Sequence, residues 1–393
     1  MRIGYLHFVL PSRAQAGLTR YGRLLAAEAR RRPGLDVLEV EVALDQHTAA
    51  NTARLREAAR RLREADVVHL QFSRYFWLAG WQQRYYWHVC QQSCPRPLVA
   101  TLHDVYPYFY PANGWRGALA DAREQWRAGA TARAPRARGA LGVLKNHLFD
   151  NLTLRAVLKD CRLALVCTRE EQRRALHLAP PGRITVIPHF VEERLHPATR
   201  AAARQALGMG GERVVTLQGY LYPNKGHQLL AQALPQLPPE VKVVFAGGPS
   251  AGQDDYLRHL QQTSQALGVA DRLCITGYLP DEALRLHLAA SDLAVCPFSV
   301  VSASSSIATW ISEARPILAS DLPQMAEYNE WAPGAVRTFR PYEAAALAAA
   351  ILALLPECGD GDDPAVARLR EALSMRRMFD RHLEAYRQAA GAS

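Results

Sequence analysis

Long apolar runs are missing from this sequence of 393 residues, since none reaches the roughly 18 to 20 residues that a membrane-spanning helix requires. The first residues, Met1 to Tyr5, lead into a β-rich stretch and not into a signal peptide. The seven cysteines are scattered, and the one close pair, Cys90 and Cys94, has no second pair to complete a zinc site. We therefore expect a cytoplasmic protein with buried free thiols and no structural metal.

Several nucleotide-binding motifs are also missing. The loop from Gly219 to Gly226 does not end in the Gly-Lys-Ser/Thr of a nucleotide triphosphatase, and it lacks the Gly-x-Gly-x-x-Gly of a dinucleotide-binding enzyme. No Asp-x-Asp stands at a predicted strand end to hold a metal ion. ATP hydrolysis and dinucleotide chemistry are therefore not the first interpretation.

What the sequence does contain is a repeated alternation of β-rich and helical runs, which predicts parallel sheets with helices on both faces. The rhythm breaks at Pro188 to Val191 and restarts at Val214. We expect an α/β protein of two Rossmann-like domains, residues 1–190 and 191–370, whose parallel sheets face a central cleft. Residues 371–393 are expected to pack back on the first domain, and one helix is predicted over 363–386.

The loop from Gly219 to Gly226 is the most informative segment, because it lies between an apolar strand and a leucine-rich helix. Free backbone N–H groups and the positive end of a helix then point above the sheet, where phosphate is the usual ligand. Lys225 adds a mobile positive charge. The loop predicts a diphosphate site.

The net charge of +10 is concentrated between residues 116 and 159, where aromatic and leucine residues are interleaved with arginine and lysine. One interpretation is a peripheral contact with the inner face of a membrane, and the other is a solvated helical face. Nucleic acid is not expected, because no recognised nucleic-acid-binding motif accompanies the charge.

Nine short passages, in order and spacing, resemble the retaining, nucleotide-sugar-dependent glycosyltransferases of family 4, which have the GT-B fold. The resemblance covers nearly the whole chain and implies transfer of a sugar from a UDP- or GDP-sugar to a hydroxyl acceptor, without a metal or other cofactor. The passages are Ala16 to Tyr21, Ala65 to His69, Thr101 to Asp104, Pro188 to Val191, Gly219 to Gly226, Phe245 to Pro249, Thr276 to Leu279, Ala290 to Leu293 and Arg315 to Asp321.

For the donor, the resemblance places Lys225 on the diphosphate, with Gly17 approaching from the first domain. The family's arginine after the first glycine of the loop is Tyr220 here, and the two family glutamates are Val301 and Thr309. Serines replace the glutamates at a helix start, where they either bind donor phosphate or only cap the helix. The other expected donor contacts are Gly219, Gly248, Gly277, Tyr278, Leu279, Ser304, Ser305, Ser306, Thr309 and Glu313, the last of which has a surface ion pair as its alternative.

For catalysis, the resemblance implies that His103 bonds the donor sugar or its surroundings, with Asp104 or a backbone carbonyl fixing its tautomer. No protein nucleophile is assigned; the acceptor hydroxyl attacks from the front and the leaving phosphate takes its proton. Asp104, Tyr106 and His189 are expected on the acceptor side.

The acceptor class stays open between cell-surface polysaccharide, glycolipid and small glycoside. Many aromatics in the first domain, from Phe72 to Trp87 and from Tyr106 to Tyr110, indicate either core packing or a groove for sugar or lipid. The rival function is a non-catalytic module that binds a nucleotide or glycan as a partner or scaffold, which the two missing glutamates favour.

Overall fold

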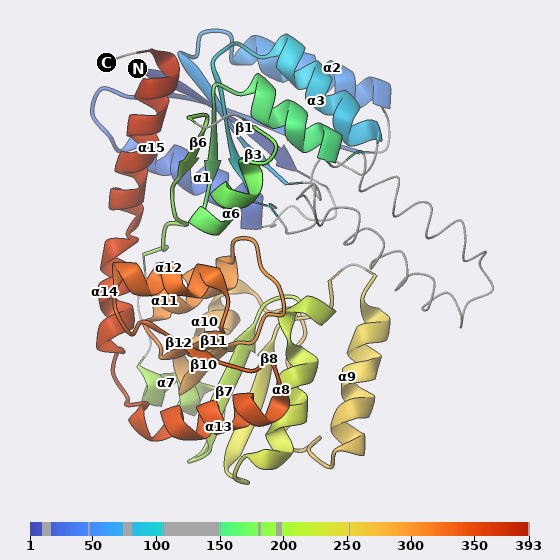
Figure 1. Cartoon of the computed structure of the whole chain (residues 1–393), viewed down its shortest axis with the longest axis vertical. Helices are drawn as coiled ribbons and strands as arrows, with labels where there is room; N and C mark the ends of the chain where they lie inside the picture. The colour runs from blue at the N-terminus through green and yellow to red at the C-terminus, as the bar shows by residue number, and fades with distance from the viewer. Residues whose placement is uncertain are drawn as a thin grey trace, which may run out of the picture. The chain divides into compact units, whose positions relative to one another are not determined.

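The computed structural model describes residues 1–9, 17–45, 48–73, 81–103, 105, 149, 151–179, 182–193, 199–250 and 252–391. It divides into two compact units, one of Met1–Pro188 with Arg376–Ser393 and the other of His189–Met375. Each unit holds a six-stranded parallel sheet (Figure 1), so the predicted α/β class with two Rossmann-like domains is confirmed. None of the described helices is both long and apolar enough to cross a bilayer.

The sheet of the first unit has the strand order β2-β1-β3-β4-β5-β6. Since its pairs are all parallel, the carboxyl ends of the strands lie at one edge. Its strands are β1 (Arg2–Val9), β2 (Asp36–Ala43), β3 (Val67–Phe72), β4 (Leu98–Leu102), β5 (Leu163–Val166) and β6 (Ile184–Val186), and its helices include α1 (Gly17–Arg30), α2 (Thr48–Arg61), α3 (Trp81–Ser93), α6 (Arg169–Ala175) and α15 (Met375–Ala390).

The two faces of this first sheet differ in chemistry. One face is apolar, and residues such as Leu6, Leu70 and Leu102 pack there with side chains from α2 and α3. Side chains of a strand point alternately to the two faces, so Tyr5, His69 and other polar residues line the opposite face. There Tyr386 of the C-terminal helix α15 contacts both residues.

The second unit has the strand order β12-β11-β10-β7-β8-β9 and its own apolar core. Its strands are β7 (Arg213–Gln218), β8 (Val241–Ala246), β9 (Leu273–Ile275), β10 (Leu293–Cys296), β11 (Ile317–Ser320) and β12 (Val336–Phe339). Its helices are α7 (Arg200–Ala206), α8 (His227–Ala233), α9 (Asp254–Ala266), α10 (Asp281–Ala290), α11 (Ser305–Glu313), α12 (Pro323–Trp331), α13 (Ala344–Leu354) and α14 (Pro364–Ala372).

The prediction of a single helix over 363–386 is wrong, because α14 ends at Ala372 and α15 begins at Met375. The backbone between the two helices pairs with Val191: Leu373 O accepts a hydrogen bond from Val191 N, and Ser374 forms a β-bridge with Val191. The sequence prediction also lacked α12 and β12. The seven thiols are free as expected, but Cys274 is exposed and not buried.

A buried carboxylate ties the start of the second sheet to α7. Asp292 is 1% exposed, and its oxygens lie 2.5 Å from Arg200 Nη1 and 2.5 Å from Arg204 Nη2. Arg213 Nη1 is 3.3 Å away, and Val214 N donates to the same carboxylate at 2.7 Å. Because the guanidinium groups depend on this anion, Asp292 stabilises the unit.

We predict that Asp292→Asn lowers the free energy of unfolding by about 3 to 5 kcal/mol, since removing one partner of a buried ion pair leaves the other charges uncompensated. Urea titration followed by fluorescence measures the loss. The matched control is Asp255→Asn, which breaks an exposed pair with Arg258 and should cost less than about 1 kcal/mol. Equal losses in the two variants would contradict this role of Asp292.

Candidate functional site

Close backbone approach shapes the loop that follows β7. Gly219 has φ +119°, and Gly226 has φ +85°, both in the region that favours glycine. A Cβ on Gly226 would stand 1.9 Å from Pro297 O, and a Cβ on Gly247 would stand 2.1 Å from Gly219 O. The loops after β7, β8 and β10 therefore pack so closely that side chains do not fit at these positions.

Lys225 lies inside this loop, at the end of the short 3₁₀ turn Pro223–Lys225, and is only 6% exposed. Its Nζ donates a hydrogen bond to Ser306 Oγ and lies 4.8 Å from the centroid of the Phe298 ring. Burial lowers the pKa of Lys225 to about 8, with no carboxylate among the causes of the shift. An anion beside Nζ would therefore be strongly stabilised.

The serines that replace the family glutamates open α11 next to Lys225. Ser304 is the N-cap, and its Oγ accepts a hydrogen bond from Ile307 N at 3.3 Å. Ser306 is buried and bonds Lys225, whereas Ser305 is exposed. Ser304 therefore caps the helix and Ser306 joins it to the glycine loop. Contact of Ser304, Ser305 or Ser306 with donor phosphate stays a prediction.

The later residues of α11 lie further from this helix start. Thr309 Oγ1 donates to Ser305 O at 2.9 Å, which keeps its hydroxyl on its own helix. Glu313 is buried at the last turn, about 12 Å along the axis from Ser305 at 1.5 Å per residue. Donor contact by Thr309 or Glu313 stays a prediction.

The loops after β8 and β9 form the neighbouring part of this edge. Thr276 Oγ1 accepts from Gly247 N at 3.1 Å, and a Cβ on Gly248 would stand 3.0 Å from Tyr278 N. Gly277 has φ +71°, and Tyr278 is 61% exposed. The loops after β8 and β9 are thus adjacent, and they carry Gly248, Gly277, Tyr278 and the half-buried Leu279. Contact of these residues with a base stays a prediction. Tyr220, which stands in place of the family arginine, is 52% exposed.

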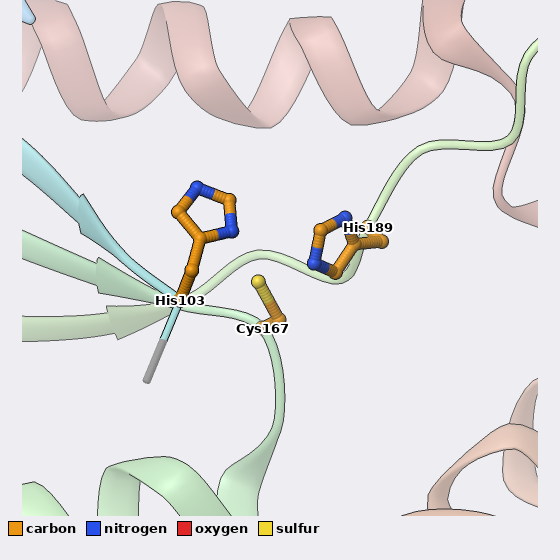
Figure 2. Close-up of side chains that lie close together, drawn as sticks. All are labelled: His103, Cys167 and His189. Atoms are coloured by element: carbon orange, nitrogen blue, oxygen red, sulfur yellow. The ribbon is translucent and has the colours of Figure 1, made fainter. Parts of the chain in front are cut away.

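In the first unit, His103 follows β4 directly, and its backbone N donates to Phe72 O at 3.0 Å. Cys167 follows the next strand, β5 (Figure 2). His189, with which the second unit begins, stands three residues beyond β6 in the chain. His103 is 8% exposed, and its Nε2 lies 2.8 Å from Gln71 Oε1. Gln71 therefore orients this ring. The sequence interpretation missed Gln71, although this residue stands two positions after His69 on β3.

The remaining predicted residues of the first unit are only partly described. Gly17 is exposed and is the first residue of α1, which Thr19 fixes to the end of β1 by donating to Phe8 O at 3.1 Å. Asp104 and Tyr106 lie outside the described residues, as does most of the basic segment 116–159. A contact of Asp104 with His103 therefore stays a prediction, and Gln71 is the side chain that the structure places on His103 Nε2.

Comparison with known proteins gives matches over both units. Residues 19–195 match Glycosyltransferase Family 4, and residues 212–357 match Glycosyl transferases group 1. The D-inositol 3-phosphate glycosyltransferase of Mycobacteroides abscessus is 30% identical over 246 residues, which is 61% of this chain and 48% of that protein. The GDP-mannose-dependent alpha-(1-6)-phosphatidylinositol monomannoside mannosyltransferase of Mycolicibacterium smegmatis is 35% identical over 127 residues, 31% of this chain and 30% of that protein. The matches thus span about half or less of these relatives' length.

Solved structures share the fold over the full chain. HepE of Anabaena, in complex with UDP-glucose, superposes with a TM-score of 0.71 at 18% identity, covering 99% of this chain and 100% of that one. WaaG, a glycosyltransferase involved in lipopolysaccharide biosynthesis, gives a TM-score of 0.65 at 15% identity, covering 100% of both chains. These likenesses show the GT-B fold, and the two family matches show that the chain belongs to the family 4, group 1 glycosyltransferases.

Proposed function

We propose that this protein is a retaining glycosyltransferase that moves a sugar from a nucleotide-diphospho-sugar to a hydroxyl acceptor. The observation that carries the proposal is the buried Lys225, joined to Ser306 at the start of α11, inside a glycine loop that packs closely against the loops after β8 and β10. A buried cation without a carboxylate partner among the causes of its pKa shift is suited to an anionic group.

The chemistry requires that the charge developing on the leaving diphosphate is stabilised. Lys225 and the backbone N–H groups at the start of α11 are held in place before the donor arrives, and preorganised groups of this kind usually supply most of the transition-state stabilisation in an enzyme. Tyr220 carries no charge where the family has an arginine, so Lys225 holds the larger share. Gly248, Gly277, Tyr278 and Leu279 are proposed to receive the base.

His103 is the proposed catalytic histidine of the first unit, where it contacts the donor sugar while the acceptor hydroxyl attacks from the side that the diphosphate leaves. The leaving phosphate takes the proton of that hydroxyl, so no protein nucleophile is needed. Metal independence is part of the proposal. The donor is a UDP- or GDP-sugar: HepE is described in complex with UDP-glucose, and the mannosyltransferase relative is GDP-mannose-dependent.

The acceptor is proposed to be a hydroxyl of a sugar, a lipid-linked glycan or a small molecule. Two relatives are named for acceptors that carry inositol and phosphate, which fits a chain with a net charge of +10. A peripheral membrane contact through residues 116–159 belongs to the same proposal.

The second candidate function is a non-catalytic module that binds a nucleotide or glycan. The specific observation in its favour is the pair of residues Val301 and Thr309, which stand where the family has glutamates. Nucleotide binding without turnover across a full panel of donors and acceptors would favour this module over the enzyme.

We expect Lys225→Ala to lower sugar transfer, or hydrolysis of the best donor, by at least about a hundredfold, because one main charge on the leaving group is lost. Turnover is measured with UDP- and GDP-sugars in the presence of EDTA. Lys242→Ala is the control, since this exposed lysine of the same unit pairs only with Glu212 in the described structure and should leave the rate unchanged. Undiminished activity of Lys225→Ala would count against the site.

Nucleotide affinity is expected to depend on pH above about 8. Burial depresses the pKa of Lys225 in the free protein to about 8, whereas a bound diphosphate favours the charged form and raises that pKa. Binding therefore takes up a proton at higher pH, and the affinity falls toward a limit of about tenfold per pH unit.

Isothermal titration with the tighter-binding of UDP and GDP between pH 7 and 9.5 measures this fall, and buffers of different ionisation enthalpy count the proton. The Lys225→Met variant should bind more weakly and lose the pH dependence. A wild-type affinity that stays constant over this range would show that Lys225 does not titrate on binding.

A further inference from the structure

A continuous line of buried hydrogen bonds leads from His103 to the C-terminal helix. His103 Nε2 lies 2.8 Å from Gln71 Oε1, and Gln71 Nε2 lies 3.4 Å from His69 Nε2. His69 Nδ1 lies 2.7 Å from Tyr386 Oη on α15, and Tyr386 Oη lies 3.4 Å from Tyr5 Oη. All five side chains are buried and belong to the first unit.

Sheet register explains why these residues meet. His69 and Gln71 are two positions apart on β3, so they share one face, and Tyr5 of β1 is paired with His69 in the parallel register. Thr101 of β4 is paired with Gln71 and lies 2.8 Å from His69 Nε2 through its Oγ1. The polar face described above thus ends at His103, at the carboxyl edge of the sheet.

The Gln71 amide fixes the direction of the hydrogen bonds on its two sides. The Gln71 carbonyl oxygen can only accept, so His103 Nε2 carries a hydrogen and donates. The Gln71 amide nitrogen can only donate, so His69 Nε2 accepts and His69 Nδ1–H donates to Tyr386 Oη. Tyr386 Oη also accepts a hydrogen bond from Tyr5 Oη at 3.4 Å, so the Tyr386 hydroxyl receives hydrogen bonds from both His69 and Tyr5. The Gln71 amide thus determines the proton positions of His103 and His69.

Burial keeps His69 and Tyr386 uncharged. It lowers the pKa of His69 well below its usual value, with nearby His382, His7 and His103 acting in the same direction. It also raises the pKa of Tyr386 well above its usual value, so the hydroxyl hydrogen stays in place. A neutral imidazole has one donor and one acceptor nitrogen. Once Nε2 of His69 accepts from Gln71, its Nδ1 must therefore be the donor.

The same helix reaches His103 by a second route. His382 of α15 lies one turn before Tyr386, and its Nε2 is 3.5 Å from Tyr21 Oη. The Tyr21 ring meets the His103 ring edge to face, with centroids 5.1 Å apart. His103 therefore forms a hydrogen bond with Gln71 and packs against Tyr21. Tyr21 contacts α15 directly through His382, and Gln71 is connected to α15 through His69 and Tyr386.

We propose that Gln71 is the positioning residue of His103: it fixes the Nε2–H tautomer and the ring orientation needed for sugar transfer, and Tyr386 of α15 anchors it through His69. The C-terminal helix is then part of the catalytic apparatus of the first unit. The kinetic part of this inference rests on the glycosyltransferase function proposed above, whereas the tautomer does not.

The tautomer is tested on the wild-type chain by two-bond ¹H–¹⁵N correlation NMR after selective histidine labelling, with His103→Gln identifying the His103 signals. We expect the shifts of the Nε2–H form for His103 and of the Nδ1–H form for His69. In Gln71→Met, which keeps the side-chain length but removes the acceptor, the His103 signals should move toward a mixture. A wild-type His103 with hydrogen on Nδ1 would overturn the proposal.

The positioning role is tested by steady-state kinetics with the best donor. Gln71→Met should lower kcat by about tenfold to a hundredfold while the affinity for the free nucleoside diphosphate is unchanged, since misplacement of a reacting group costs on this scale. Tyr386→Phe should give a smaller loss in the same direction. Gln71→Glu keeps an acceptor for His103 and should recover part of the kcat lost in Gln71→Met.

The matched control is Tyr86→Phe, because the Tyr86 hydroxyl is buried in the same unit and accepts from Asn51 Nδ2 at 2.9 Å without contacting the line to His103. It should change neither kcat nor the His103 signals. A loss of kcat in Tyr86→Phe equal to that in Gln71→Met would reduce Gln71 to a structural residue and overturn the proposal. Absence of turnover in the wild type, with the predicted tautomer present, would contradict the proposed function and leave the positioning contact established.

Discussion

Parallel pairing of β7 with β8 on one side and with β10 on the other is the constraint on which the candidate donor site depends. It brings the ends of three strands to one edge, and the loops that leave them pack so closely that a Cβ does not fit at Gly226 or Gly247. Glycine is required at positions 226 and 247 because a neighbouring carbonyl oxygen occupies the place of a Cβ. The glycines are thus a consequence of the sheet as much as an accommodation of a ligand.

Within that edge, the charge of Lys225 is placed where solvation is poor. Burial of an amine costs free energy unless an anion or a hydrogen bond compensates it, and Ser306 offers only a neutral hydroxyl. The second unit also contains the opposite arrangement, the buried Asp292 surrounded by three arginines. The contrast between the two sites agrees with the proposal that Asp292 is a structural charge and that the Lys225 charge is held for a ligand.

The first unit uses its sheet in two ways at once. Its apolar face packs against α2 and α3 and supplies the core, while its other face carries histidine, glutamine, threonine and tyrosine side chains under α15. Buried polar groups are acceptable in such a place because they satisfy one another, and a satisfied network also fixes orientation. Tyr386 of α15 contacts His69 although the two residues are 317 positions apart in the chain. The orientation of the His69 ring therefore depends on the C-terminal helix.

The sequence by itself determined the α/β rhythm, the two parallel sheets, the glycine loop with Lys225, and the family, because these follow from local hydrophobic period and from motifs of fixed spacing. It also indicated that serines open α11 where the family has glutamates. The prediction of one helix over 363–386 was wrong. The helical period continues through Leu373 and Ser374, but in the structure Leu373 O accepts a hydrogen bond from Val191 N and Ser374 forms a β-bridge with Val191. Only the tertiary structure decided that Ser306 bonds Lys225, that Gln71 contacts His103, and that Tyr386 supports this contact. These depend on side chains far apart in the chain that meet through strand register and burial, which no local pattern of residues encodes.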